Sequence, residues 1–338
     1  MTKKFKLSTV IGARPQFIKS SALSRVLQQE SWIEEYTIHS GQHYDDNLSA
    51  IFFDELKIQT PKYFVSPLNE TINNYTVEFT SNLMKNLCSI WTLEKPDAVL
   101  VYGDTNSTLA AALCAAQMNI PIAHVEAGLR SHRTDMPEEL NRKITDHISH
   151  ALFCPTENAV NNLSSENITK NVFNVGDLHF DASVYARNNA SSNIIHSLNL
   201  RKNEYALCTV HRSENTRSKP DLMKIIDYLR NLSESFLKDK TILLVIHPRT
   251  RKAIDEFGLN DNLNSIKNIT IVNPVGYFDM QALIASCYCV ITDSGTLQKE
   301  AYFHSRLCLT LRDETEWVET VRCGWNRLWD MASWVEPR

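Results

Sequence analysis

The chain has 338 residues, a length typical of two domains of ordinary size. Its 35 basic and 39 acidic residues give a formal net charge of −4 without blocks of like charge, which argues against a nucleic-acid or anionic-lipid surface. With 43% hydrophobic and 22% charged residues, the composition is that of an ordered globular protein. No apolar run approaches the roughly 20 residues that cross a bilayer, and the first residues show no leader pattern. We therefore expect a cytoplasmic protein that binds neither membranes nor nucleic acid.

The eight cysteines lie mostly inside apolar stretches, where a free cysteine behaves as a small hydrophobic residue. Cys287 and Cys289 are separated by one residue, whereas paired zinc ligands are usually separated by two to four, and no histidine pair accompanies them. We expect buried structural thiols and no metal site.

Short apolar runs alternate with helical patterns along the chain, which predicts parallel sheets covered by helices. The expected strands are residues 5–11, 35–39, 98–102, 122–125, 151–154, 172–175, 205–210, 242–246, 269–272, 289–291 and 307–311. A polar stretch rich in Asn and Ser interrupts the pattern before residue 205. We predict an α/β fold of two doubly wound, Rossmann-like domains, residues 1–177 and 205–338, joined by a linker over residues 178–204.

Ligands of doubly wound sheets bind beyond the carboxyl ends of the strands, so the residues that follow each expected strand are the functional candidates. The sequence GARPQFIK follows the first strand and places Arg14 in a turn and Lys19 on the next helix. Two cations and free helix amides suit a phosphate group. Only Gly12 is present where a dinucleotide fingerprint has three glycines, so no nicotinamide cofactor is indicated.

Acidic residues occupy three such positions in the first half. Asp104 follows strand 98–102, Glu126 follows strand 122–125, and Glu138 opens a helix. Asp104 alone is explained as a helix cap and Glu138 alone as a partner of a helix dipole, whereas a carboxylate at Glu126, in a short glycine-containing turn, is poorly explained by structure. Together they form the kind of carboxylate set that proton abstraction or stabilisation of an oxocarbenium-like centre requires.

Histidine and arginine side chains follow two strands of the second half. His211 and Arg212 come after strand 205–210, and His247 comes after strand 242–246. Two histidine-bearing strand ends with arginine nearby favour an anionic ligand.

A turn of small residues follows strand 289–291. Ser294 and Gly295 offer free amides to a phosphate, and Glu300, about one helical turn later, is placed to accept hydrogen bonds from a ribose diol. Phosphate and ribose at this spacing indicate a nucleotide.

Seven motifs occur in the order GARPQFIK, SGQHYD, VYGDTNSTL, HVEAGLRS, MPEELNR, TVHRSEN and ITDSGTLQKEA. In wording, order and separation they resemble the non-hydrolysing UDP-N-acetylglucosamine 2-epimerase family, from about residue 8 to about residue 326. The first two motifs and LRDETEWVETVRCGWN are most similar to the branch that includes 2-epimerases of UDP-2,3-diacetamido-2,3-dideoxy-glucuronate.

The resemblance implies a GT-B-like fold whose two domains face a central cleft, a UDP-sugar substrate, no cofactor and a homodimer. It implies elimination of UDP to a glycal and re-addition, which interconverts UDP-N-acetylglucosamine and UDP-N-acetylmannosamine for surface polysaccharides. The implied catalytic residues are Asp104, Glu126, Glu138 and His211. The implied substrate-binding residues are Arg14, Lys19, His43, Arg212, His247, Val275, Tyr277, Met280, Ser294, Gly295, Thr296 and Glu300, with the loop 273–280 beside the uracil.

The sequence departs from the family pattern at three places. Thr296 stands where the phosphate turn usually has glycine, so we expect hindered backbone approach and weaker UDP binding. Residues 67–71 replace a glycine-rich stretch, which predicts an altered sugar loop. The sequence ends soon after GWN, where relatives usually continue, which predicts weaker domain closure.

Two functions of other classes are the alternatives to an epimerase. A retaining glycosyltransferase of similar fold would share the nucleotide half but does not need the acids Asp104, Glu126 and Glu138. A non-catalytic UDP-sugar binder would be consistent with the departures from the family pattern.

Overall fold

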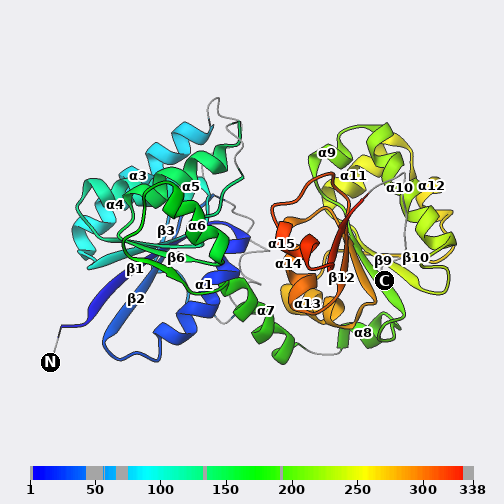
Figure 1. Cartoon of the computed structure of the whole chain (residues 1–338), viewed down its shortest axis with the longest axis horizontal. Coiled ribbons are helices and arrows are strands. Elements are labelled where there is room, and N and C mark those ends of the chain that lie inside the picture. The colour runs from blue at the N-terminus through cyan, green and yellow to red at the C-terminus, as the bar shows by residue number, and fades with distance from the viewer. Residues whose placement is uncertain are drawn as a thin grey trace. The chain divides into compact units, whose positions relative to one another are not determined.

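The structure is a computed structural model that describes residues 3–42, 56, 58–65, 75–131, 135–190 and 193–329. The chain divides into two compact units, Met1–Ala182 and Ser183–Arg338. Each unit contains one sheet covered by helices (Figure 1). No helix in these described ranges is both long and apolar enough to cross a membrane.

The first unit is built on a seven-stranded sheet. Its elements are β1 (Phe5–Ile11), α1 (Arg14–Leu27), β2 (Ile33–His39), β3 (Tyr63–Phe64), α3 (Tyr75–Glu94), β4 (Ala98–Tyr102), α4 (Asn106–Gln117), β5 (Ile122–Val125), α5 (Pro137–Ile148), β6 (Ala151–Cys154), α6 (Glu157–Ser165), β7 (Val172–Asn174) and the start of α7 (Leu178–Asn189). The strand order is β3-β2-β1-β4-β5-β6-β7, and every neighbouring pair is parallel. Helices α3, α4 and α5 lie on one face of this sheet and α1 lies on the other (Figure 1).

The second unit has a six-stranded sheet. Its elements after α7 are α8 (Asn193–Ser197), β8 (Tyr205–Thr209), α9 (Ser213–Thr216), α10 (Lys219–Glu234), β9 (Thr241–Val245), α11 (Pro248–Phe257), α12 (Asn260–Asn264), β10 (Ile269–Val272), α13 (Tyr277–Ser286), β11 (Cys289–Thr292), α14 (Gly295–Phe303), β12 (Leu307–Thr310), α15 (Val318–Arg322) and β13 (Asn326–Leu328). The order is β10-β9-β8-β11-β12-β13, again with parallel neighbours.

Both faces of the second sheet are buried, which explains why its strands are continuous apolar runs. Ala206 and Cys208 of β8 pack into the core that contains the apolar face of α10. Tyr205 and Leu207, which alternate with them, pack into the opposite core together with α13. The two-residue period of a strand thus distributes one segment between two cores.

The predicted α/β fold of two doubly wound sheets is confirmed, and every expected strand is present with its ends shifted by no more than two residues. Strands β3 and β13 were not expected, because β3 has only two residues and β13, Asn326–Leu328, is mostly polar, so neither forms an apolar run. The polar stretch 178–204 contains α7 and α8, and the boundary between the units falls within α7. Helix α1 begins at Arg14, so this residue is helical and does not lie in the preceding turn.

The strand order reverses between β1 and β4 in the first sheet and between β8 and β11 in the second. At such a reversal the connecting helices leave to opposite faces, and a crevice opens beyond the carboxyl ends of the two strands. The predicted phosphate, carboxylate and histidine residues follow these four strands or their neighbours.

Gly128 supplies a test of the backbone that follows β5. Its φ is +79°, and a Cβ atom there would lie 2.3 Å from the carbonyl oxygen of Ala159. We predict that Gly128→Ala lowers the free energy of unfolding by about 2–5 kcal/mol, from the left-handed conformation and the clash together. Gly176 is the matched control, since its φ is +81° with no atom near its Cβ position. Gly176→Ala should cost about 1–2 kcal/mol, and equal losses in urea unfolding would contradict the steric argument.

Candidate functional site

The turns after β1 and β4 are joined by Gln16, which is 2% exposed. Its Oε1 accepts hydrogen bonds from the backbone N–H groups of Gly12 and Ala13, at 2.8 and 3.0 Å. Its Nε2 donates to the carbonyl oxygen of Tyr102 at 2.9 Å and to the hydroxyl of Thr105 at 3.0 Å. One buried amide therefore fixes the GARPQ segment against the turn that carries Asp104.

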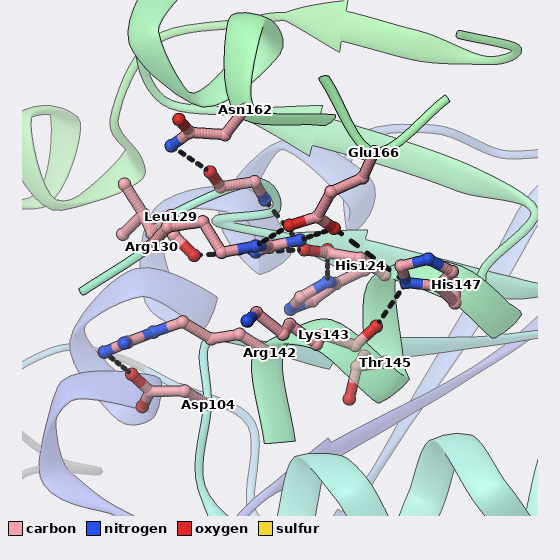
Figure 2. A network of polar contacts seen from close by, with 12 residues as sticks. Asp104, His124, Leu129, Arg130, Arg142, Lys143, Thr145, His147, Asn162 and Glu166 are labelled. Carbon is pink, nitrogen blue, oxygen red and sulfur yellow. Dashed lines mark hydrogen bonds and ion pairs between the residues drawn. The ribbon is translucent and has the colours of Figure 1, made fainter. Parts of the chain in front are cut away.

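Asp104 is held by an arginine of α5 (Figure 2). Arg142 donates from Nη2 to Asp104 Oδ2 at 2.5 Å and from Nη1 to Glu139 Oε2 at 3.0 Å. Burial by itself would raise the pKa of Glu139, but hydrogen bonds from the backbone and hydroxyl of Ser131 and the charge of Arg142 outweigh it and lower that pKa. A chain of charged groups thus joins the β4 turn to the first turn of α5.

Glu126 adopts a backbone conformation that is rare for a residue with a side chain, with φ at 69°. Such strain concentrates at functional sites. Its carboxylate forms an ion pair with the ammonium of Lys19, and the two side chains are 11% and 9% exposed. Glu126 Oε2 lies 3.2 Å from the point that a Cβ of Gly103 would occupy, so this carboxylate lies against the turn of Asp104.

The buried carboxylate of Asp146 holds the turns that follow β4 and β5 in place. Asp146, 1% exposed, accepts from the backbone N–H of Gly128 at 3.1 Å and from Nη1 of Arg130 at 2.7 Å. It also contacts Nδ1 of His124 at 2.7 Å, while Nε2 of the same ring lies 2.8 Å from the carbonyl oxygen of Gly103. The network therefore anchors the residues on both sides of Glu126 and the residue before Asp104.

Arg130 connects this network to α6 (Figure 2). It donates to the two carboxylate oxygens of Glu166 at 2.7 Å each. Burial would raise the pKa of Asp146, but the hydrogen bond and charge of His124 and the charge of Arg130 lower it overall. For Glu166 the hydrogen bonds from Arg130 are the largest cause of a lowered pKa.

The remaining predicted residues of the first unit are less enclosed. Arg14 is exposed at the start of α1, and Glu138 is half-buried in the first turn of α5. His43 lies outside the described residues, as do residues 67–71 and the carboxyl-terminal residues 330–338, on which two of the expected departures from the family pattern rest.

In the second unit the turns after β8 and β11 are joined by Asp293. This carboxylate is 0% exposed. It accepts from the backbone N–H of His211 at 3.0 Å, from that of Arg212 at 2.9 Å and from Nδ2 of Asn215 at 2.9 Å. The rings of His211 and His247 are 5.6 Å apart, so two of the predicted histidines lie together.

The predicted phosphate turn lies at the start of α14. Ser294 is the N-cap, and its hydroxyl accepts from the backbone N–H of Leu297. The Cβ position of Gly295 is 3.9 Å from Nη2 of Arg212 and 3.5 Å from Oε2 of Glu316. Thr296 is half-buried in the first turn of the helix. The structure therefore brings Ser294, Gly295 and Arg212 together.

Two residues predicted beside the uracil are packed inside the second unit. Tyr277 is 1% exposed with its hydroxyl 3.4 Å from that of Ser183, and Met280 belongs to the apolar core. Both side chains remain predicted nucleotide contacts. Their burial does not favour such contacts. Val275 is half-buried, and Glu300, predicted to meet the ribose, is 2% exposed.

All eight cysteines are free, and six of them are buried. Burial raises the pKa of Cys114 to about 11 and of Cys154, Cys287 and Cys308 to about 12. These thiols stay protonated at neutral pH and act as packing groups, as expected from the sequence.

The polar residues that hold the candidate site in place were not predicted from the sequence. Arg142, Glu139 and Asp146 sit on one helix, and the MPEELNR motif contains the first two. Gln16 and Asp293 also lie within quoted motifs. Their roles depend on partners as far as 92 residues away in sequence, which no local pattern reveals.

Asp146 provides a second test. Asp146→Asn should lower the free energy of unfolding by about 3–5 kcal/mol, because it leaves the buried charge of Arg130 with Glu166 alone. The folded-state pKa of Asp146 lies below its unfolded value, so its ionisation stabilises the fold above pH about 4 and this contribution is lost as pH falls through the folded pKa. The variant should therefore lose less stability on acidification than the parent.

The control for this test is Glu166→Gln, which removes the other partner of Arg130. Glu166 is 24% exposed on its side chain, so its loss should cost less than the loss of Asp146. Urea unfolding at several pH values measures both variants. Equal costs, or an unchanged acid dependence in Asp146→Asn, would contradict the assignment.

Comparison with known proteins gives one consistent result. The sequence model of the UDP-N-acetylglucosamine 2-epimerase family matches residues 25–333. A UDP-N-acetylglucosamine 2-epimerase homolog of Methanococcus maripaludis is 46% identical, covering 96% of this chain and 88% of the relative. The UDP-2,3-diacetamido-2,3-dideoxy-D-glucuronate 2-epimerase of Pseudomonas aeruginosa is 41% identical with the same coverage.

Solved structures agree. The Methanocaldococcus jannaschii UDP-GlcNAc 2-epimerase, in complex with UDP-GlcNAc and UDP, has a TM-score of 0.82 at 43% identity, covering 96% of this chain and 88% of that one. The Neisseria meningitidis enzyme bound to UDP-GlcNAc has a TM-score of 0.83 at 30% identity, covering 96% and 87%. The fold, the ordered motifs and these matches over nearly the whole chain show that this protein belongs to the UDP-N-acetylglucosamine 2-epimerase family.

Proposed function

We propose that this protein is a non-hydrolysing UDP-N-acetylglucosamine 2-epimerase that interconverts UDP-N-acetylglucosamine and UDP-N-acetylmannosamine. The C2 proton of a sugar has no adjacent carbonyl and is scarcely acidic. UDP therefore begins to leave first, which makes C1 electron-poor. Breaking of the C1–O bond and transfer of the C2 proton to a carboxylate give a glycal. Return of UDP to C1, with a proton delivered to the opposite face of C2, gives the epimer.

One observation supports this proposal above the others. Two carboxylates from adjacent strand ends, Asp104 after β4 and Glu126 after β5, lie at the same edge of the first sheet, and each is held by a cation. Carboxylates fixed in advance near a reacting carbon need little reorganisation in the transition state. A glycosyltransferase or a simple nucleotide binder has no need of this pair.

The second unit supplies the groups that a nucleoside diphosphate requires. The start of α14 at Ser294 and Gly295 offers backbone amides, and Arg212 lies beside them. His211 is 40% exposed on its side chain, so it is available to a ligand. We propose that these residues hold UDP while it is detached from the sugar, with His247 of the same unit as a further contact to the anion.

A second substrate is favoured by one finding, the 41% identity to the P. aeruginosa epimerase of UDP-2,3-diacetamido-2,3-dideoxy-D-glucuronate. The two nucleotides differ at C3 and C6 of the sugar, so the reaction at C1 and C2 is the same for both. Incubation of the protein with each nucleotide in deuterated water, followed by proton NMR, distinguishes them, because the true substrate gains deuterium at C2 and changes configuration.

The carboxylate roles lead to a prediction about turnover. Asp104→Asn and Glu138→Gln should each slow C2 deuterium exchange by about 100- to 10,000-fold, the usual cost of losing a general acid or base. The control is Glu157→Gln, because Glu157 is likewise an acid in the first turn of a helix, α6. It should exchange at the parental rate. Parental exchange in both variants would contradict the catalytic role and leave Asp104 as an ion-pair partner of Arg142 and Glu138 as an acid of the first turn of α5.

We also propose that the protein is a cytoplasmic homodimer. Eight free cysteines fit a reducing compartment, and the family resemblance implies the dimer. Sedimentation equilibrium should give twice the mass of the chain at micromolar concentration. A mass equal to one chain would reject the dimer.

A further inference from the structure

The carboxylate of Asp293 has no contact with solvent, yet it lies next to the residues proposed to bind phosphate. It is 0% exposed, directly precedes Ser294, and accepts the backbone N–H groups of His211 and Arg212. Nε2 of His211 is 3.8 Å from Oδ1. Because it is fully buried, Asp293 can act on a nucleotide only through the residues that it holds.

Asp293 connects the segments that follow β8, β11 and β12, which lie at the same edge of the second sheet. Strands β8 and β11 are paired in register up to Thr209 and Thr292, where the ladder ends. Beyond that point Asp293 is the link from β11 back to the β8 turn. Asn215 extends the link, since its Nδ2 donates to Asp293 at 2.9 Å and to the carbonyl oxygen of Leu311, just after β12, at 3.3 Å.

We propose that Asp293 is a positioning residue for the nucleotide, which holds His211 and Arg212 at the start of α14 so that both segments bind the diphosphate as one preformed site. The proposal rests on the proposed function, because it needs UDP to bind in the second unit. Preformed donors bind an anion better than donors that must first be ordered, since the ordering costs free energy at the moment of binding.

Because Asp293 is negatively charged, the direction in which its replacement changes UDP affinity tests the proposal. A negative charge beside a phosphate site opposes anion binding, so removing the charge alone should tighten UDP. Removing a positioning acceptor should weaken UDP, because the backbone donors at His211 and Arg212 lose their common partner. In Asp293→Asn the two effects act in opposite directions, and the measured direction shows which one dominates.

The experiment is calorimetric titration of UDP into the parent, Asp293→Asn and Asp293→Ala, well below their melting temperatures. We expect UDP affinity to fall about three- to tenfold in Asp293→Asn, the effect of weakening one buried hydrogen-bonded contact. In Asp293→Ala it should fall by more than about tenfold, because buried N–H groups lose their acceptor. The amide variant keeps the size of the side chain, so it tests the proposal even if the alanine variant does not fold.

Thr209→Val is the matched control. The hydroxyl of Thr209 lies 2.7 Å from that of Thr292, so this variant breaks a buried hydrogen bond between the same two strands, one step before the turns. It should lower the melting temperature and leave the UDP dissociation constant within about twofold.

Three results would overturn the proposal, and they are distinguishable. If the parent binds UDP while Asp293→Asn melts earlier with unchanged or tighter UDP binding, Asp293 is only a structural acceptor and the proposed function stands. If the parent itself does not bind UDP, the proposed function fails and the positioning role fails with it. Equal weakening in Thr209→Val and Asp293→Asn would also overturn it, because general loosening of the strands would then explain both.

Discussion

The central constraint in each unit is the need to satisfy backbone groups where the parallel ladder stops. Beyond the last paired residues of the central strands, N–H and C=O groups turn inward without a strand partner, and burying them unpaired is costly. Gln16 meets this need between β1 and β4, and Asp293 meets it between β8 and β11. Both residues lie where the strand order reverses, so the fold places buried polar contacts next to the candidate functional groups.

Gln16 is an amide and Asp293 is a carboxylate because the backbone groups that they connect differ. Gln16 faces donors on one side, at Gly12 and Ala13, and acceptors on the other, at Tyr102, so an amide with one oxygen and one NH₂ matches them. Asp293 accepts N–H groups from His211, Arg212 and Asn215, so a carboxylate is the matching group. Local hydrogen-bonding geometry thus explains a negative charge next to the proposed anion site.

The sequence predicted the sheets and the strand-end motifs because both are local signals, namely apolar runs of three to seven residues and polar residues directly after them. It did not predict contacts that depend on the order of strands in space. Lys19 was expected to bind phosphate, yet its ammonium pairs with Glu126, which is 107 residues away in sequence. Arg142 lies within a quoted motif, but its bond to Asp104 spans 38 residues and requires α5 to pack against α4 and β5. Motif reading identified the candidate reacting groups, whereas the groups that orient them could be found only from the tertiary structure.

The three sugar-side acids differ in how firmly they are oriented. Arg142 fixes Asp104, and Lys19 fixes Glu126 while the backbone of Glu126 is held in a left-handed conformation between anchored neighbours. Among the described residues, no cation pairs with the half-buried Glu138. Epimerisation at C2 requires proton transfer on both faces of a planar carbon, and a group that serves one face cannot reach the other without moving. In the proposed reaction, Asp104 and Glu126 are the acids held in place and Glu138 is the acid with more freedom to move. Oriented acids can stabilise charge without reorganising, and a freer acid can adapt to the face that they do not serve.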